Sequence, residues 1–194
     1  MHELLFQHFD RLVPVTEAEF APLAALLTAR SLGKKEVLLR PGEVCKTLNF
    51  VAAGVLRAFT TDAKGVEFTD QFAFEGWWAS DLYSFLTGEP GSYTIEALES
   101  SRVLQLSHHG VQHLLATMPL FERYFRLLLQ NNYIATHRRL NLALSRPAED
   151  TYDALLATHP TIMQRVPQHM VASYLGITPE FLSRLRGRKL RGKS

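Results

Sequence analysis

Residues 167–186 constrain the fold of this chain more than any other segment, because they predict two short helices joined by one tight turn. Val171, Ala172 and Leu175 stand at the i, i+1, i+4 spacing of one apolar helix face. The small side chain of Ala172 would let a second helix cross closely, and Gly176 suits the left-handed position that ends a helix. The segment therefore predicts a helix-turn-helix.

The second helix of this pair has its own start signal. Thr178 is a good N-cap and Pro179 a good first residue. Glu180, Ser183 and Arg184 would share its outward face. In a helix-turn-helix the start of the second helix enters the major groove of DNA. There Arg184 suits guanine O6 and N7, Glu180 suits the cytosine amino group, and Ser183 could reach a base or a phosphate.

The charge of the chain is concentrated at the same end. Six bases and no acid follow Phe181, whereas the whole chain carries only +2, so the remaining residues carry −4. Such a basic end favours contact with nucleic-acid phosphates. The side chains expected to make those contacts are Gln168, His169, Thr178, Arg186, Arg188 and Lys189. The alternative for this segment is an ordinary helical hairpin with a solvated polar face.

Residues 34–107 have a different pattern, with short β-rich runs separated by glycines. Gly42, Gly54, Gly65 and Gly76 recur every 11–12 residues, a spacing typical of a sandwich or barrel. The sequence Asp-Ala-Lys-Gly at 62–65 predicts a hairpin turn. Strands are predicted at 37–39, 48–52, 55–60, 66–74, 93–98 and 103–106.

Helices are predicted on both sides of this region, at 3–11, 17–29, 108–117, 120–144 and 148–158, with Thr16 capping the second. The helix at 120–144 has two apolar stripes, interrupted by Asn131 and Asn132. We expect it to pair with the same helix of a second copy, and burial inside one subunit is the alternative.

The predicted fold class is α+β. It consists of an N-terminal double-stranded β-helix (a jelly-roll-like β-roll) flanked by helices, a long dimerisation helix, and a C-terminal helix-turn-helix domain. The expected domains are a β-roll sensor at 1–118, the long helix and linker at 119–147, and the DNA-binding domain at 148–194.

This order of elements resembles the Crp/Fnr family of bacterial transcription regulators. The resemblance rests on Arg-Pro-Gly-Glu at 40–43, on Val-Ala-Ala-Gly-Val-Leu-Arg at 51–57, and on residues 171–184. It covers nearly the whole chain and implies a cyclic nucleotide-binding-like β-roll in front of the helix-turn-helix.

The resemblance also bears on single residues of the second helix. Glu180, Ser183 and Arg184 match the E-x-x-S-R motif with which the Fnr subgroup contacts bases, so it implies that role for them. Pro179 stands where the cyclic AMP receptor protein has an arginine, so that contact is not expected here.

The effector pocket departs from the family pattern. Members that bind cyclic AMP carry a Gly-Glu pair for the ribose and an Arg-Ser or Arg-Thr pair for the phosphate. Here Trp77 follows Gly76, and Gly91 precedes Ser92. A buried phosphate needs a cationic partner, so cyclic AMP is not expected to bind in the usual manner. The aromatic side chains fill the cavity or line it for another effector. The expected pocket residues are Gly76, Trp77, Trp78, Gly91, Ser92 and Tyr93.

Other chemistry has little support in the sequence. The single Cys45 excludes a cysteine-ligated iron–sulfur cluster and an internal disulfide, and it fits a reducing cytoplasm. Residues 34–107 contain no histidine for a cupin-like metal enzyme. His109 and His113, one helical turn apart beside His108, suit capping or solvated roles better than a metal site. Neither a G-x-S-x-G motif nor a phosphate loop is visible. We expect no catalytic activity, no cofactor and no metal.

The sequence thus predicts a DNA-binding transcription regulator in the cytoplasm, without a signal peptide or membrane span. Its expected partners are double-stranded DNA, a second copy of the chain, RNA polymerase, and a small-molecule effector that the sequence does not identify. The alternative is a degenerate cyclic nucleotide-binding-like module that contacts proteins and binds no specific DNA, with a basic tail that only aids solubility.

Overall fold

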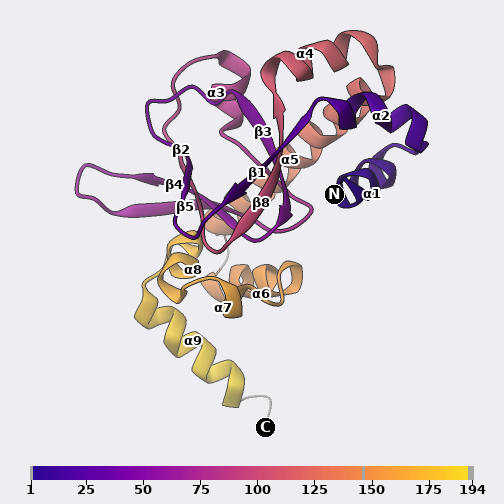
Figure 1. The fold of residues 1–194 in the computed structure, drawn as a ribbon. Helices are drawn as coiled ribbons and strands as arrows, with labels where there is room; N and C mark the ends of the chain where they lie inside the picture. The colour runs from indigo at the N-terminus through magenta and orange to yellow at the C-terminus, as the bar shows by residue number, and fades with distance from the viewer. Residues whose placement is uncertain (1, 146, 192–194) are drawn as a thin grey trace.

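Two four-stranded antiparallel sheets form the body of the protein (Figure 1). The computed structural model describes residues 2–145 and 147–191, leaving aside the side chains of 142–145 and 189–191. The first sheet has the order β1 (Leu27–Leu32), β8 (Ser101–Ser107), β3 (Thr47–Ala53) and β6 (Trp78–Ala79). The second has the order β2 (Val37–Leu39), β7 (Thr94–Ala97), β4 (Leu56–Thr61) and β5 (Glu67–Ala73). Strands that neighbour one another in space are mostly distant in sequence, as in a jelly-roll-like β-roll.

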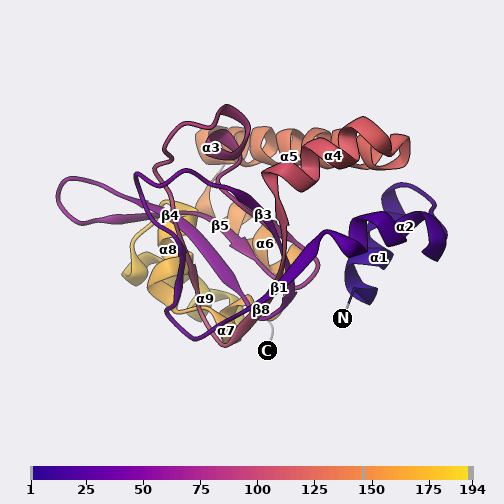
Figure 2. The same cartoon turned by 45° about the horizontal axis from the view of Figure 1, so that its top comes forward.

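Along the chain, helices precede the strands of the roll, interrupt them once and follow them. Before and within it lie α1 (Glu3–Leu12), α2 (Glu17–Ala25) and α3 (Leu82–Thr87). After it come α4 (His108–Thr117), α5 (Pro119–Ser145), α6 (Ala148–Thr158), α7 (Ile162–Arg165), α8 (Gln168–Leu175) and α9 (Pro179–Arg191). Figure 2 shows α4 and α5 running along one side of the roll, with α6–α9 gathered on another. Among the described residues, no helix has both the length and the hydropathy needed to cross a bilayer.

The predicted α+β class and the β-roll are confirmed, and most predicted strand boundaries hold to within one or two residues. The helix predicted at 17–29 is wrong at its end. A capping box between Thr16 and Glu19 starts it as expected, but the helix stops at Ala25. Leu27–Leu32 then pairs with β8, from Leu27 opposite Leu106 to Leu32 opposite Ser101. Hydrogen bonds to a distant strand thus override the local helical pattern.

A single aromatic cluster joins α1 and the start of α5 to the first sheet. The ring of Phe9 stacks on that of Tyr124 with centroids 4.2 Å apart, and Phe50 and Phe121 are buried beside them. All four side chains are at most 1% exposed. Burial of such large rings is worth roughly 1.5–3 kcal/mol each, so this cluster fixes the N-terminal helices against the roll.

A second hydrophobic cluster unites the roll with the C-terminal helices. The roll contributes Val55, Phe72, Phe74 and Leu98. The C-terminal helices contribute Tyr152, Leu155, Ile162, Val166, Val171, Ala172, Leu182 and Leu185. The core of the helix-turn-helix is therefore continuous with one face of the second sheet.

Side chains from the C-terminal half cover the open edge of β5, the last strand of the second sheet. The hydroxyl of Ser173 on α8 accepts a hydrogen bond from Thr69 N (2.9 Å) and donates one to Glu67 O (2.7 Å). Arg139 on α5 donates to the carbonyl and carboxylate of Asp70. Unpaired N–H and C=O groups on an edge strand would otherwise be free to pair with another chain. The side chains of Ser173 and Arg139 satisfy three of these backbone groups within one subunit.

Gly54 marks a close approach between two backbone segments of the roll. A Cβ atom at this position would lie 2.2 Å from Ser101 Oγ and 2.7 Å from Ser101 Cα, and φ is +91°. Only glycine fits both the contact and the left-handed backbone. The regular spacing of glycines therefore has a steric basis at this turn.

We expect Gly54→Ala to lower the free energy of unfolding by about 2–4 kcal/mol, since left-handed strain and overpacking each cost about 1–3 kcal/mol. Gly65→Ala is the matched control, because Gly65 has φ +82° and a Cβ added there would meet no atom within 4 Å. It should cost only about 1 kcal/mol. Urea denaturation followed by circular dichroism measures both, and equal losses would contradict the steric argument.

Candidate nucleic-acid interface

The two helices at the C-terminal end pack as a helix-turn-helix. Val171 and Ala172 of α8 and Leu182 and Leu185 of α9 are all 0% exposed. Gly176 ends α8 with φ +66°, and the N–H of Ile177 donates to Ala172 O at 3.0 Å. These contacts fix the crossing of α9 over α8, as the apolar spacing and the glycine predicted.

The start of α9 is capped as predicted. The N–H of Phe181 donates to the Thr178 hydroxyl at 3.2 Å, and Pro179 is the first helical residue. A fixed helix start matters here because it sets which side chains face outward. The three predicted base-contacting residues are all exposed on that face.

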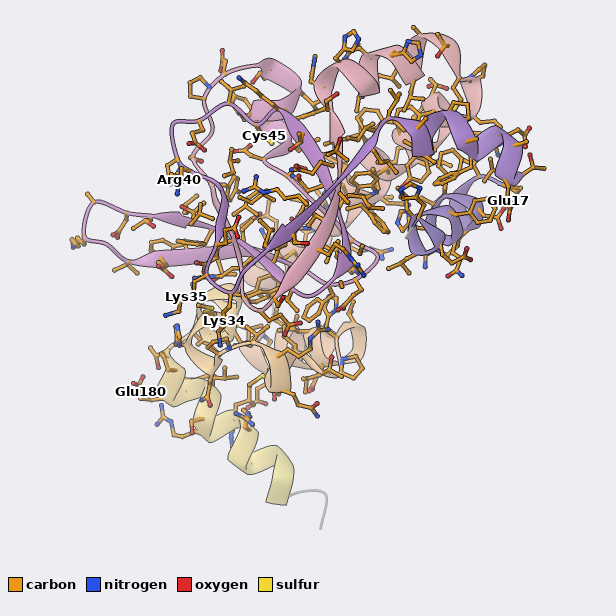
Figure 3. The ribbon with its side chains drawn as sticks, viewed as in Figure 1. Glu17, Lys34, Lys35, Arg40, Cys45 and Glu180 are labelled. Carbon is orange, nitrogen blue, oxygen red and sulfur yellow. The ribbon has the colours of Figure 1, made fainter. Side chains whose placement is uncertain are left out.

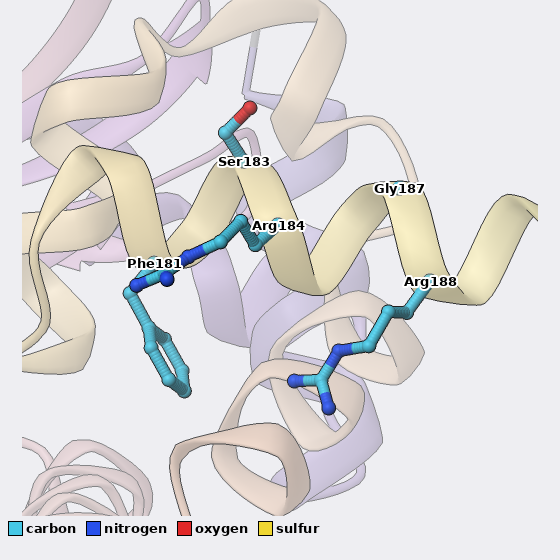
Figure 4. A pocket seen from close by; sticks show the side chains of 5 residues that line it. All are labelled: Phe181, Ser183, Arg184, Gly187 and Arg188. Carbon is cyan, nitrogen blue, oxygen red and sulfur yellow. The ribbon is translucent and has the colours of Figure 1, made fainter.

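The outward face of α9 presents a cation and an anion one turn apart. Figure 4 shows Arg184 extended along the helix towards Phe181, with its guanidinium carbon 5.9 Å from the ring centroid. Hydrogen bonds from its own backbone N–H and from Thr178, together with the nearby charge of Arg184, hold the pKa of Glu180 below its usual range. Glu180 is thus an acceptor and Arg184 a donor, which is the chemistry that cytosine and guanine edges require.

The predicted phosphate-contacting residues lie in two kinds of environment. His169 and Thr178 are exposed at the start of their helices. Gln168 instead bridges the two helices, donating to Pro179 O at 3.2 Å and accepting from Arg186 at 3.0 Å.

Arg188, further along α9, also has a partner within the subunit. Arg188 forms an ion pair with Glu149 of α6 and is 64% exposed. Contact of Arg188 with a phosphate would exchange that ion pair for another. The side chain of Lys189 lies outside the described residues.

An ion-pair cluster that no sequence pattern predicted holds α7 to the roll. Arg165 makes a bidentate contact with Glu75, at 2.7 and 2.9 Å, and reaches Glu99 at 2.5 Å. This contact lowers the pKa of Glu75, and hydrogen bonding to both carboxylates raises that of Arg165. The partners are 66 and 90 residues apart in the chain, so no local pattern signals them.

Trp77, predicted to belong to the effector pocket, contacts the C-terminal domain. Its ring lies 5.0 Å from that of His159, which stacks on Phe74 at 4.4 Å. Burial lowers the pKa of His159. Trp77 is 40% exposed. It follows Gly76 in the turn between β5 and β6, and it forms part of the junction between roll and helices.

Trp78 belongs to the interior of the roll. Its ring lies 5.3 Å from Phe50, and its indole N–H donates to the hydroxyl of Tyr124 at 2.9 Å. The same hydroxyl is hydrogen-bonded to Nδ1 of His8 at 2.8 Å. Burial, followed by the charge of Arg11, lowers the pKa of His8 to about 4. His8 is therefore neutral near pH 7, and this polar trio completes the aromatic core.

Gly91 lies where the family pattern places the phosphate-binding arginine, and its surroundings are anionic. A Cβ atom at Gly91 would lie 2.1 Å from Asp81 Oδ2. The Asp81 side chain is 3% exposed and caps α3 by accepting from Ser84 N at 3.1 Å. Gly91 also exchanges backbone hydrogen bonds with the turn at 40–43, to Gly42 and Glu43. The loop is closed on this turn with a carboxyl group beside it.

The other two residues of this loop that were predicted to line the pocket, Ser92 and Tyr93, differ in exposure. Ser92 is exposed and Tyr93 is half-buried. Burial and then the charge of Asp70 raise the pKa of Tyr93. Of the six predicted pocket residues, Gly91, Ser92 and Tyr93 thus lie in one loop. Gly76 and Trp77 lie in the turn between β5 and β6, and Trp78 lies in β6.

In the described part of the chain, no three His, Cys, Asp or Glu side chains lie close enough together to hold a metal ion. His108 packs against Phe85, with ring centroids 5.1 Å apart. Cys45 is buried, and burial raises the pKa of its thiol, so it is a poor thiolate ligand.

Comparisons with known proteins agree with this architecture. Residues 29–118 match the family model of the cyclic nucleotide-binding domain. The fumarate and nitrate reduction regulatory protein of Vibrio cholerae is 25% identical in an alignment that covers 91% of this chain and 75% of that protein.

Two solved structures share the fold. FixK2 from Bradyrhizobium japonicum has a TM-score of 0.74 at 15% identity and covers 86% of each chain. A transcriptional regulator of the Crp/Fnr family from Eubacterium rectale has a TM-score of 0.67 at 16% identity, covering 92% of this chain and 85% of its own.

The fold and the site therefore define a cyclic nucleotide-binding-domain β-roll joined to a helix-turn-helix. Over most of its length the chain is similar to transcription regulators of the Crp/Fnr type.

Proposed function

We propose that this protein is a DNA-binding transcription regulator of the Crp/Fnr type that acts as a homodimer in the cytoplasm. The observation that carries the proposal is the exposed face of α9. Glu180, Ser183 and Arg184 are exposed there, on a helix whose opposite face is buried at Leu182 and Leu185. A recognition helix needs this combination of a rigid inner face and a free outer face.

Arg184→Ala tests base contact. Duplexes would first be selected by the unmodified protein from a randomised library, and binding then measured by fluorescence anisotropy at fixed salt. We expect the variant to lose about 10- to 100-fold of discrimination between selected and random duplexes, because one bidentate arginine contact is worth about 1–3 kcal/mol.

Arg11→Ala is the matched control, since Arg11 is an exposed arginine on α1, far from α9 (Figure 1). It should leave discrimination unchanged. Unchanged discrimination in Arg184→Ala would contradict the assignment of Arg184. Failure of the unmodified protein to prefer any duplex would instead favour the protein-interaction module.

The second half of α5 supports the dimer. Phe121, Tyr124 and Phe125 bury the first half within the subunit, whereas residues 131–138 are all exposed. Tyr133 is 68% exposed and Ile134 45% exposed. A helix that keeps a run of exposed residues with apolar side chains in water favours pairing with a symmetric copy.

Ile134→Asp should shift the sedimentation coefficient from dimer to monomer at micromolar concentration, because two carboxylates would face an apolar seam. Gln112→Asp adds the same charge on α4, at an exposed position, and should leave the dimer intact. A dimer that persists in Ile134→Asp at the lowest concentration measured would place the contact elsewhere.

We infer in addition that the β-roll does not hold cyclic AMP by the usual phosphate clamp. Gly91 supplies no guanidinium, and Asp81 would set a carboxyl group against the phosphate. Like charges in a site of low dielectric repel strongly. An uncharged or cationic effector suits this loop better than a cyclic nucleotide does.

Isothermal titration calorimetry with cyclic AMP and cyclic GMP should give no binding heat at micromolar ligand. Gly91→Ala is not informative as a rescue, because its Cβ would strike Asp81. The competing result is micromolar binding of either nucleotide by the unmodified protein, which would show that another group replaces the clamp.

A further inference from the structure

Phe181 is a half-buried aromatic side chain in the first turn of α9, next to Glu180 in sequence. It occupies one of the two open positions of the E-x-x-S-R motif, so the family resemblance gives it no role. The core of the helix-turn-helix does not account for it either. The half-buried apolar side chains that pack on that core, within the described part of the chain, do not include Phe181; they are Leu156, Met163, Met170, Tyr174, Leu175 and Ile177.

The ring borders a groove whose lining residues all belong to α9. They are Phe181, Ser183, Arg184, Gly187 and Arg188 (Figure 4). Ser183 and Arg184, two of the predicted base-contacting residues, therefore share this groove with Phe181. In Figure 3, Glu180 stands at the edge of the molecule, in the same turn of the helix. The groove joins an apolar ring to cationic side chains, and such a surface suits DNA, with its phosphates, better than an apolar segment of another protein.

Two contacts fix the position of the ring. The N–H of Phe181 donates to the Thr178 hydroxyl at 3.2 Å, which anchors its backbone at the start of the helix. The guanidinium carbon of Arg184 lies 5.9 Å from the ring centroid, since side chains three residues apart on a helix are neighbours. Arginine can stack on an aromatic ring while its N–H groups remain free to donate. Phe181 and Arg184 thus present an apolar surface and a donor fork side by side.

The spacing of these two side chains matches neighbouring base pairs. Three residues of a helix rise by about 4.5 Å, and successive base pairs are roughly 3.4 Å apart. The first residues of a recognition helix meet base edges in the major groove. The apolar group that base pairs present there is the C5 methyl of thymine, and phenylalanine is among the side chains that contact it. A ring held beside Arg184 has no other apolar partner on the base edges.

We propose that Phe181 is a specificity-determining residue, whose ring contacts the C5 methyl group of a thymine beside the guanine that Arg184 contacts. This inference rests on the proposed function and deepens it. Glu180 and Arg184 contact hydrogen-bonding edges, whereas Phe181 selects a base by apolar contact. It therefore sets the preference at a base pair that Arg184 does not contact.

The test removes single methyl groups from the DNA. The base pairs shared by duplexes that the unmodified full-length protein selects form the core, and the guanine in question is the position at which Arg184→Ala loses discrimination. Each thymine of the core is replaced singly by deoxyuridine, which lacks the C5 methyl and keeps every hydrogen-bonding group. Binding is measured by fluorescence anisotropy at fixed salt. This arm uses the unmodified protein, so it does not depend on the folding of a variant.

For the unmodified protein, deoxyuridine beside that guanine should weaken binding about four-fold, the factor expected for one buried methyl group. In Phe181→Ala, which removes the ring, the same replacement should have no effect. Tyr83→Ala is the matched control and should keep the loss, because Tyr83 is an aromatic side chain 60% exposed on α3, far from α9 (Figure 1). Thermal melting checks that both variants are folded.

A core without a thymine beside that guanine overturns this inference and leaves the proposed function standing. So does a deoxyuridine replacement there that leaves the affinity of the unmodified protein unchanged. A loss that persists in Phe181→Ala also overturns it, because another side chain would then contact the methyl group. Absence of any duplex preference in the unmodified protein overturns both this inference and the proposed function.

Discussion

The open edge of β5 is the constraint on which the arrangement of the two domains depends. A sheet edge must be paired, covered or charged, and here Ser173 and Arg139 cover it with hydrogen bonds to Glu67, Thr69 and Asp70. The hydrophobic cluster and the ion pairs of Arg165 surround this contact. The helix-turn-helix is thus docked through α8, which leaves the outward face of α9 free.

This docking joins the β-roll to the C-terminal helices. Strand β5 leads directly into the turn that holds Gly76 and Trp77, and Trp77 touches His159 of the C-terminal domain. The same proximity brings Lys34 and Lys35 of the roll to the start of α8.

Much of the fold and of the outward face of α9 could be predicted, because both depend on local signals. The glycine spacing indicated the roll, and Gly54 shows the steric reason. Thr178 and Pro179 indicated the start of α9. The strand at Leu27–Leu32 was missed because its only support is pairing with β8. For the effector pocket, family position grouped Trp77 with Gly91, although their neighbours in space differ.

The sequence by itself determined where most of the helices and strands begin, which face of α9 is polar, and which charges lie at the C-terminal end, since helix caps, periodicity and composition act over a few residues. Only the tertiary structure decided which of those groups meet. It set Asp81 beside Gly91, tied Gln168 to Arg186, paired Arg165 with two distant glutamates, and brought two lysines of the roll to α8. Such contacts join residues of different structural elements, and only the packing of whole elements fixes their distances.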